Sequence, residues 1–97
     1  MEVRIQAIHF DASEKLSSFI NKKAEKLTRR FPAIDYIEAV LTVVKPETSM
    51  NKEARIKVIV PHDGEQVATK VADTFEEAVD LALEAIERQL EKIKDKK

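Results

Sequence analysis

The sequence predicts an α+β fold, a two-layer sandwich in which one four-stranded sheet carries two helices on one face. Two long helical patterns alternate with four strand-like stretches in the order β-α-β-β-β-α. The last three strand patterns follow one another with short connections, which favours an antiparallel meander. Each helical pattern has a single apolar stripe, and a common sheet face lets both stripes be buried.

The first two elements have clear local signals. Residues 2–9 alternate between polar and apolar side chains, as in a strand with one buried face. Asp11, with Glu14 three residues later, is a D-x-x-E variant of the capping box, and Phe10 before it is placed to form the apolar half of a staple. The first helix should end at Pro32, because the residue before a proline is pushed out of helical geometry.

Three strands are predicted in the middle of the chain. Residues 37–45, 53–60 and 66–72 are rich in β-branched residues or alternate in polarity. An Asp-Gly pair at 63–64 predicts a hairpin between the last two. The first strand is expected in the same sheet, at an edge and in a direction that the pattern leaves open.

The longest helical pattern runs from Asp73 to Lys94 and begins with a second D-x-x-E signal. It contains no glycine or proline, and most of its residues lose little entropy in a helix. Its apolar stripe consists of Phe75, Val79, Ala82, Leu83, Ile86, Leu90 and Ile93.

Length and composition limit the class of protein. With 97 residues the chain should form one domain over residues 1–97, with an ordered core from about residue 2 to about residue 94. The absence of cysteine excludes disulfides and thiol nucleophiles, and no apolar run is long enough to cross a membrane. The N-terminus lacks a secretory pattern, so we expect a cytoplasmic protein.

Few residues suggest catalysis. His9 and His62 have no second convergent group for a metal or base site, and the serines lack a Gly-flanked nucleophile turn. A single glycine excludes a Gly-rich phosphate loop. We therefore expect no enzyme, no cofactor and no small-molecule substrate.

Charge is unevenly distributed although the net charge is −1. The segment from Lys15 to Arg30 has six basic residues and one acid, whereas the segment from Asp63 to Glu87 has eight acids and one base. Lys15, Lys22, Lys26 and Arg29 form one stripe on the first helix, flanked by Lys23 and Arg30, and a solvated helix face is the simplest interpretation of it. Arg4, Arg55 and Lys57 fall on polar strand positions, which predicts a basic open sheet face as well.

A cationic surface spread over a helix and a sheet face suits a phosphate backbone. The shortage of exposed aromatic residues favours recognition of a folded RNA by its shape and phosphates. The candidate RNA-binding residues are Lys22, Lys23, Lys26, Arg29, Arg30, Lys45, Arg55, Lys57, Arg88 and Lys92. The alternative is a protein–protein adaptor that binds through the acidic outer face of the second helix, at Asp80, Glu84 and Glu87.

Three motifs resemble the short ribosome hibernation promoting factors, also called ribosome-associated translation inhibitors. They are K-x-x-K-L-x-R at 23–29, V-L-T-V-V-K at 40–45, and D-x-F-x-x-A-V-D followed by I-E-R-Q-L-x-K between 73 and 92. Ala85 stands where the family usually has Lys, and Phe75 where it has Tyr. The resemblance covers nearly the whole chain, and E-R-Q-L with the upstream A-V-D is its most specific part.

The resemblance implies a fold similar to a double-stranded-RNA-binding domain after the first strand. It also implies binding to the small ribosomal subunit at the decoding region, where the protein blocks messenger and transfer RNA and silences idle ribosomes. The C-terminal dimerisation domain of the long forms is not expected, so pairing of ribosomes would need a second factor. The residues of this chain that match basic positions of the family's motifs are Lys23, Lys26, Arg29, Lys45, Arg88 and Lys92.

Overall fold

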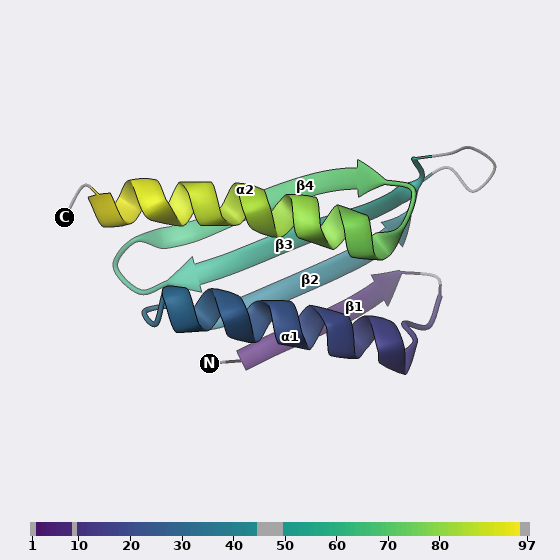
Figure 1. Cartoon of the computed structure of the whole chain (residues 1–97), viewed down its shortest axis with the longest axis horizontal. Helices are drawn as coiled ribbons and strands as arrows, with labels where there is room; N and C mark the ends of the chain where they lie inside the picture. Colours follow the sequence, from purple (N-terminus) through teal and green to yellow (C-terminus); the bar gives the residue numbers. More distant parts are fainter. Residues whose placement is uncertain (1, 9, 45–49, 96–97) are drawn as a thin grey trace.

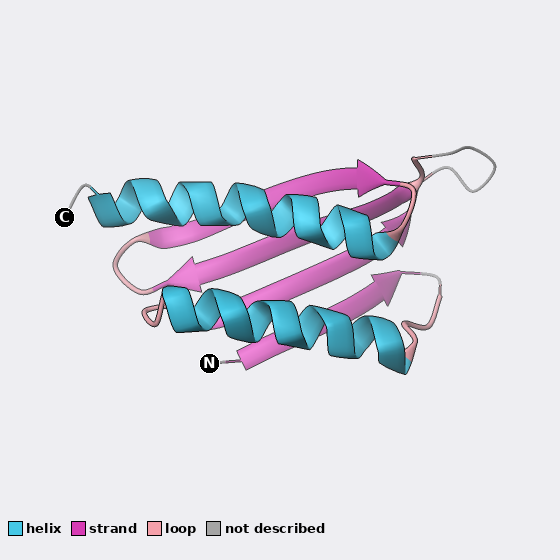
Figure 2. Ribbon diagram, in the orientation of Figure 1, coloured by secondary structure: helices cyan, strands magenta, loops and turns pink. Residues whose placement is uncertain are grey.

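A computed structural model describes residues 2–8, 10–44 and 50–95. Residues 94 and 95 are described by their backbone alone. Helices and strands follow in the predicted β-α-β-β-β-α order, and the α+β class is confirmed (Figure 2). The elements are β1 (Glu2–Ile8), α1 (Glu14–Arg30), β2 (Tyr36–Val43), β3 (Lys52–Val60), β4 (Gly64–Ala72) and α2 (Phe75–Asp95).

The four strands form one sheet in the order β1-β2-β3-β4. β2, β3 and β4 make the predicted antiparallel meander, and β1 pairs with β2 in parallel at the sheet edge. Parallel neighbours need a long crossover connection, and α1 supplies it. This settles the edge and direction that the sequence pattern left open.

Both helices cover the same face of the sheet and run side by side in the same direction (Figure 1). α1 lies on the β1 side, and α2 packs on β3 and β4. The inward positions of the central strands alternate with outward ones, as the period of two requires. Buried inward residues of β2 and β3 are Ile37, Ala39, Leu41, Ala54, Ile56, Val58 and Val60.

The apolar stripe of α2 is the largest contribution of one element to this core. Val79, Ala82 and Ile86 are fully buried, and Leu90 is 4% exposed. Burial of a side chain of the size of Val or Ile contributes about 1.5 to 3 kcal/mol. The stripe therefore holds α2 on the sheet, while the opposite side of the helix stays in solvent.

The start of α1 differs from the prediction. Ser13, and not Asp11, is the N-cap: its hydroxyl accepts a hydrogen bond from the Leu16 amide at 3.1 Å. The predicted staple fails as well, because the residue before this N-cap is Ala12; the Phe10 ring instead stacks on Phe75 with centroids 4.8 Å apart. This stack joins the loop before α1 to the first residue of α2.

The start of α2 differs in the same way. The Thr74 hydroxyl accepts a hydrogen bond from the Glu77 amide at 3.1 Å, so Thr74 takes the place predicted for Asp73. Asp73 instead accepts a hydrogen bond from the backbone amide of Met50 at 2.7 Å. Asp73 therefore holds the backbone just before β3 and does not cap α2.

β4 begins at Gly64, two residues earlier than predicted, because Gly64 and Glu65 already pair with the end of β3. Gly64 has a φ of +86°, which a residue without a Cβ adopts readily. His62 is exposed in the preceding turn, and His9 lies outside the described residues. Among the described residues, no helix has the length and hydropathy needed to cross a membrane.

Candidate nucleic-acid interface

Three exposed cations, Lys22, Lys26 and Arg29, form what we call the α1 cation row. They are spaced by four and three residues, so they share the side of α1 that faces away from the core. Within the described part of the chain none of the three makes an ion pair. The predicted exposed stripe is thus present for these three residues, and their charges are available to a ligand.

Lys23, by contrast, turns toward α2. Its Nζ lies 3.1 Å from Asp80 Oδ1, and it also lies 5.4 Å from the centre of the Phe19 ring. The Lys23 side chain is 35% exposed and that of Asp80 is 50% exposed. This predicted RNA-binding residue already has a partner inside the molecule.

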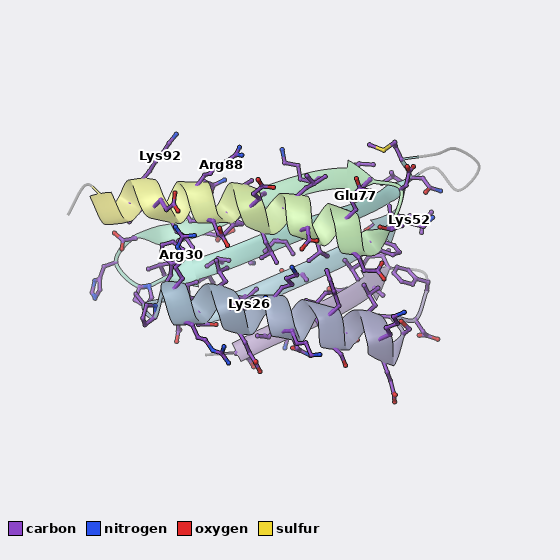
Figure 3. The ribbon with its side chains drawn as sticks, in the orientation of Figure 1. Lys26, Arg30, Lys52, Glu77, Arg88 and Lys92 are labelled. Carbon is purple, nitrogen blue, oxygen red and sulfur yellow. The ribbon has the colours of Figure 1, made fainter. Side chains whose placement is uncertain are left out.

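Arg30 is held by two carboxylates of α2. Its Nη1 donates to Glu87 Oε2 at 3.2 Å, and its Nη2 pairs with Glu91. In Figure 3 the Arg30 side chain lies in the space between the two helices. Since two pairs converge on one guanidinium, Arg30 fastens the C-terminal end of α1 to α2.

We call the set of Lys23, Arg30, Asp80, Glu87 and Glu91 the interhelical seam. Carboxylates three or four residues apart on α2 repel one another, and so do the cations of α1. Side-by-side packing of the two helices places the opposite charges together and relieves both repulsions. A basic helix and an acidic helix in one sequence are a signal of this contact. The signal can be used only when the two helices are known to be neighbours.

The acidic residues in the middle of α2 are consequently paired within the chain although their side chains are exposed. A polar groove between the helices is lined by Lys23, Lys26, Asp80, Glu84 and Glu87. Asp80 and Glu87 pair with α1, as described above, and Glu84 pairs with Arg88 on its own helix at 3.5 Å. The three carboxylates that would serve a protein-binding adaptor are therefore engaged within the chain.

The open face of the sheet is not basic, contrary to the prediction. Arg55 is exposed there, but Lys57 pairs with Glu38 at 3.6 Å across β2 and β3. Because directly paired residues share a face, acidic residues outnumber basic ones on the described open face. The charged residues of that face are Glu2, Arg4, Glu38, Glu53, Arg55, Lys57 and Glu65.

Tyr36 lies on the same open face and has a perturbed acidity. Its hydroxyl donates a hydrogen bond to Glu38 Oε2 at 3.2 Å. Partial burial and this hydrogen bond raise the pKa of Tyr36 above its ordinary value, although Arg4 acts in the opposite direction. Sequence reasoning gave this residue no role.

The C-terminal half of α2 presents two further predicted cations. Arg88, whose side chain is 75% exposed, and Lys92 project from the side of α2 that faces away from α1 (Figure 3). The helix layer thus carries the α1 cation row on one side and this pair on the other, with the seam between them. Lys45 lies outside the described residues.

In residues 2–8, 10–44 and 50–95, no group of three or more His, Cys, Asp or Glu side chains could hold a metal ion. What α1 offers a ligand is the positive charge of the α1 cation row at its surface. That charge suits a polyanion rather than a reacting small molecule.

Comparison with known proteins relates the chain to ribosome-associated factors. Residues 3–97 match the family described as Sigma 54 modulation protein / S30EA ribosomal protein. A ribosome hibernation promoting factor of Azotobacter vinelandii is 29% identical over 96 residues, which is 99% of this chain and 85% of the relative.

Two solved structures have the same fold. A ribosomal subunit interface protein from Coxiella burnetii superposes with a TM-score of 0.86 at 22% identity, covering 98% of this chain and 99% of that one. The N-terminal domain of Protein Y from Thermus thermophilus has a TM-score of 0.80 at 18% identity, covering 96% and 99%. At these identities the likeness shows the shared fold.

Proposed function

Because the chain belongs to the Sigma 54 modulation protein / S30EA ribosomal protein family, a family of ribosome-associated hibernation factors and not of enzymes, we propose that it binds the small ribosomal subunit. There it occupies the decoding region and blocks messenger and transfer RNA. Inhibition is by occupancy, so no bond is made or broken.

The observation that carries this proposal is the α1 cation row. Lys22, Lys26 and Arg29 lie exposed over residues 22–29, and Lys22 and Arg29 are seven positions apart, which corresponds to about 10 Å at 1.5 Å per residue. A row of that length can meet more than one phosphate of an RNA strand. Each cation that binds a phosphate releases counterions, which drives association at low salt.

Arg88 and Lys92 add a second point of contact on the same layer. Because they lie beyond the seam, an RNA surface that touches both cation groups would span the two helices. Such a contact would recognise how phosphates are spaced rather than which bases they join.

The aromatic side chains support recognition of phosphates over stacking on bases. Phe10 and Phe75 stack on each other, Phe31 is 8% exposed, and Phe19 lies under Lys23. A stacking platform for single-stranded RNA needs exposed rings. The described helix layer therefore suits folded ribosomal RNA.

The name of the Azotobacter vinelandii relative supports the physiological part of the proposal. It is a ribosome hibernation promoting factor, and it aligns with nearly all of this chain. We accordingly propose that this chain also silences idle ribosomes.

Binding to purified ribosomal subunits tests the proposal. The wild-type chain should co-sediment with small subunits and not with large ones, and binding should weaken steeply with salt. Loss of one phosphate contact lowers affinity roughly tenfold at 0.1 M salt, so K22E/R29E should bind roughly 100-fold more weakly.

The matched control is R4E/K70E, which has the same charge change at two exposed residues of β1 and β4. It should bind nearly as well as the wild type. Equal losses in the two double variants would reject the α1 cation row as the binding surface, and association with large subunits alone would reject the proposed target.

A further inference from the structure

We propose that Asp80, Glu87 and Glu91 are internal competitors of the RNA. They occupy Lys23 and Arg30 until phosphates displace them, and in this way they set the affinity and the salt response of binding. This inference rests on the proposed function for the identity of the polyanion.

The geometry of the seam makes such an exchange possible. The Arg30 side chain is 54% exposed and its partners Glu87 and Glu91 are 39% and 44% exposed. Exposed ion pairs contribute about 0 to 1 kcal/mol each, because solvent screens them and ordering two long side chains is unfavourable. A phosphate can therefore replace a carboxylate at either cation without breaking the core.

The paired cations also lie where the RNA would arrive. Lys23 follows Lys22 directly, and Arg30 follows Arg29, so each paired cation flanks a member of the α1 cation row. An RNA strand on that row comes within reach of both long side chains. Rotamer changes alone would move their charges from α2 to the phosphates.

The exchange has an electrostatic cost that the free cations do not have. When Arg30 turns to a phosphate, Glu87 and Glu91 are left unpaired beside a polyanion, and they attract counterions again. The net release of counterions at Arg30 is then smaller than at Lys26. The wild-type chain should therefore bind more weakly, and with a shallower salt dependence, than a chain whose carboxylates are neutral.

The variant E87Q/E91Q removes the competing charges and keeps the side-chain shapes. The fold should persist, since the lost ion pairs are weak and the repulsion between Glu87 and Glu91, four residues apart, disappears with them. The matched control is E2Q/E65Q, whose two residues lie on the open face of the sheet, away from the α1 cation row. Its two carboxylates are exposed, and neither makes an ion pair with another described residue.

The first measurement is the salt concentration at which each variant elutes from immobilised heparin, a generic sulfated polyanion. We expect E87Q/E91Q to elute at clearly higher salt than E2Q/E65Q, although their net charges are equal. In a chain that carries Arg30→Gln, the change E87Q/E91Q should no longer raise the elution salt relative to Arg30→Gln alone, because the gain acts through Arg30. Equal elution of the two double variants, or a gain that survives Arg30→Gln, would overturn the inference.

The second measurement is the Kd for small ribosomal subunits as a function of salt. E87Q/E91Q should bind about three- to tenfold more tightly than E2Q/E65Q at low salt. The slope of log K against log salt should be steeper by up to about 0.9, which is one additional phosphate contact. If the heparin difference is present but no variant binds the small subunit, the proposed function is wrong while the internal competition stands.

Discussion

A charge swap between α1 and α2 should show that the seam stabilises the fold. We predict that Lys23→Glu destabilises the chain and that adding Asp80→Lys largely restores its stability. The Nζ of Lys23 lies 3.1 Å from Asp80 Oδ1, and the ammonium also lies 5.4 Å from the Phe19 ring centre. Reversal removes both attractions and places two carboxylates together.

The size of the effect follows from the exposure of the pair. At half-exposed positions an ion pair contributes about 0.2 to 1 kcal/mol, and a like-charge pair destabilises by a similar amount. Loss of the cation–π contact adds roughly 0.5 kcal/mol. Lys23→Glu should therefore lower the free energy of unfolding by about 1 to 2 kcal/mol, of which the Asp80→Lys change recovers the electrostatic part.

Urea unfolding followed by circular dichroism gives these free energies, because the midpoint and slope yield stability directly. The control is Lys22→Glu, one residue earlier on the same helix, which is exposed and lacks an ion pair among the described residues. It should change stability by less than about 0.5 kcal/mol. If Lys22→Glu and Lys23→Glu are equally stable, or if the double variant is the least stable, the pairing across the seam is refuted.

Three more predictions concern the core, the sheet face and a turn. Ile86→Ala should reduce the free energy of unfolding by about 2 to 5 kcal/mol, because Ile86 is fully buried, whereas Leu81→Ala on the same helix, at a 38% exposed position, should cost less than about 0.5 kcal/mol in urea titrations. Tyr36 is the only tyrosine, so absorbance at 295 nm should show an ionisation above its ordinary pKa, and Glu38→Gln should lower it. The raised pKa means that the folded state favours the neutral phenol. The stability that Tyr36 contributes is therefore complete below the pKa of the unfolded state, and it is lost as pH rises through the pKa of the folded state. Gly64→Ala should lower the free energy of unfolding by about 1 kcal/mol through the φ of +86° alone, since the added Cβ meets no atom within 4 Å outside its chain neighbours; an unchanged melting temperature would contradict that.

Much of the fold was predictable because period-two and period-3.6 patterns report which side of an element is buried. The patterns say nothing of strand neighbours, so the parallel pairing of β1 with β2 could not be derived from them. The caps were missed for a local reason. Each helix start offers two acceptable N-cap residues within two positions, Asp11 and Ser13 for α1 and Asp73 and Thr74 for α2. The hydrogen bonds from the Leu16 and Glu77 amides show that Ser13 and Thr74 are the caps.

The candidate site was predictable to a smaller extent. Helical spacing alone places Lys22, Lys26 and Arg29 on one exposed face. It cannot show that Lys23 and Arg30 meet carboxylates some sixty residues later in the chain, because that contact depends on how the two helices lie. The open sheet face was misjudged because strand alternation was counted for basic residues only, and the acids of neighbouring strands share that face.

Chemical footprinting of small-subunit RNA in the presence of the chain is the most direct test of the proposed function. The wild-type chain should protect nucleotides of the decoding region. K22E/R29E should lose this protection at a concentration where R4E/K70E retains it. Protection confined to another part of the subunit, or protection that K22E/R29E leaves intact, would contradict binding through the α1 cation row at the decoding region.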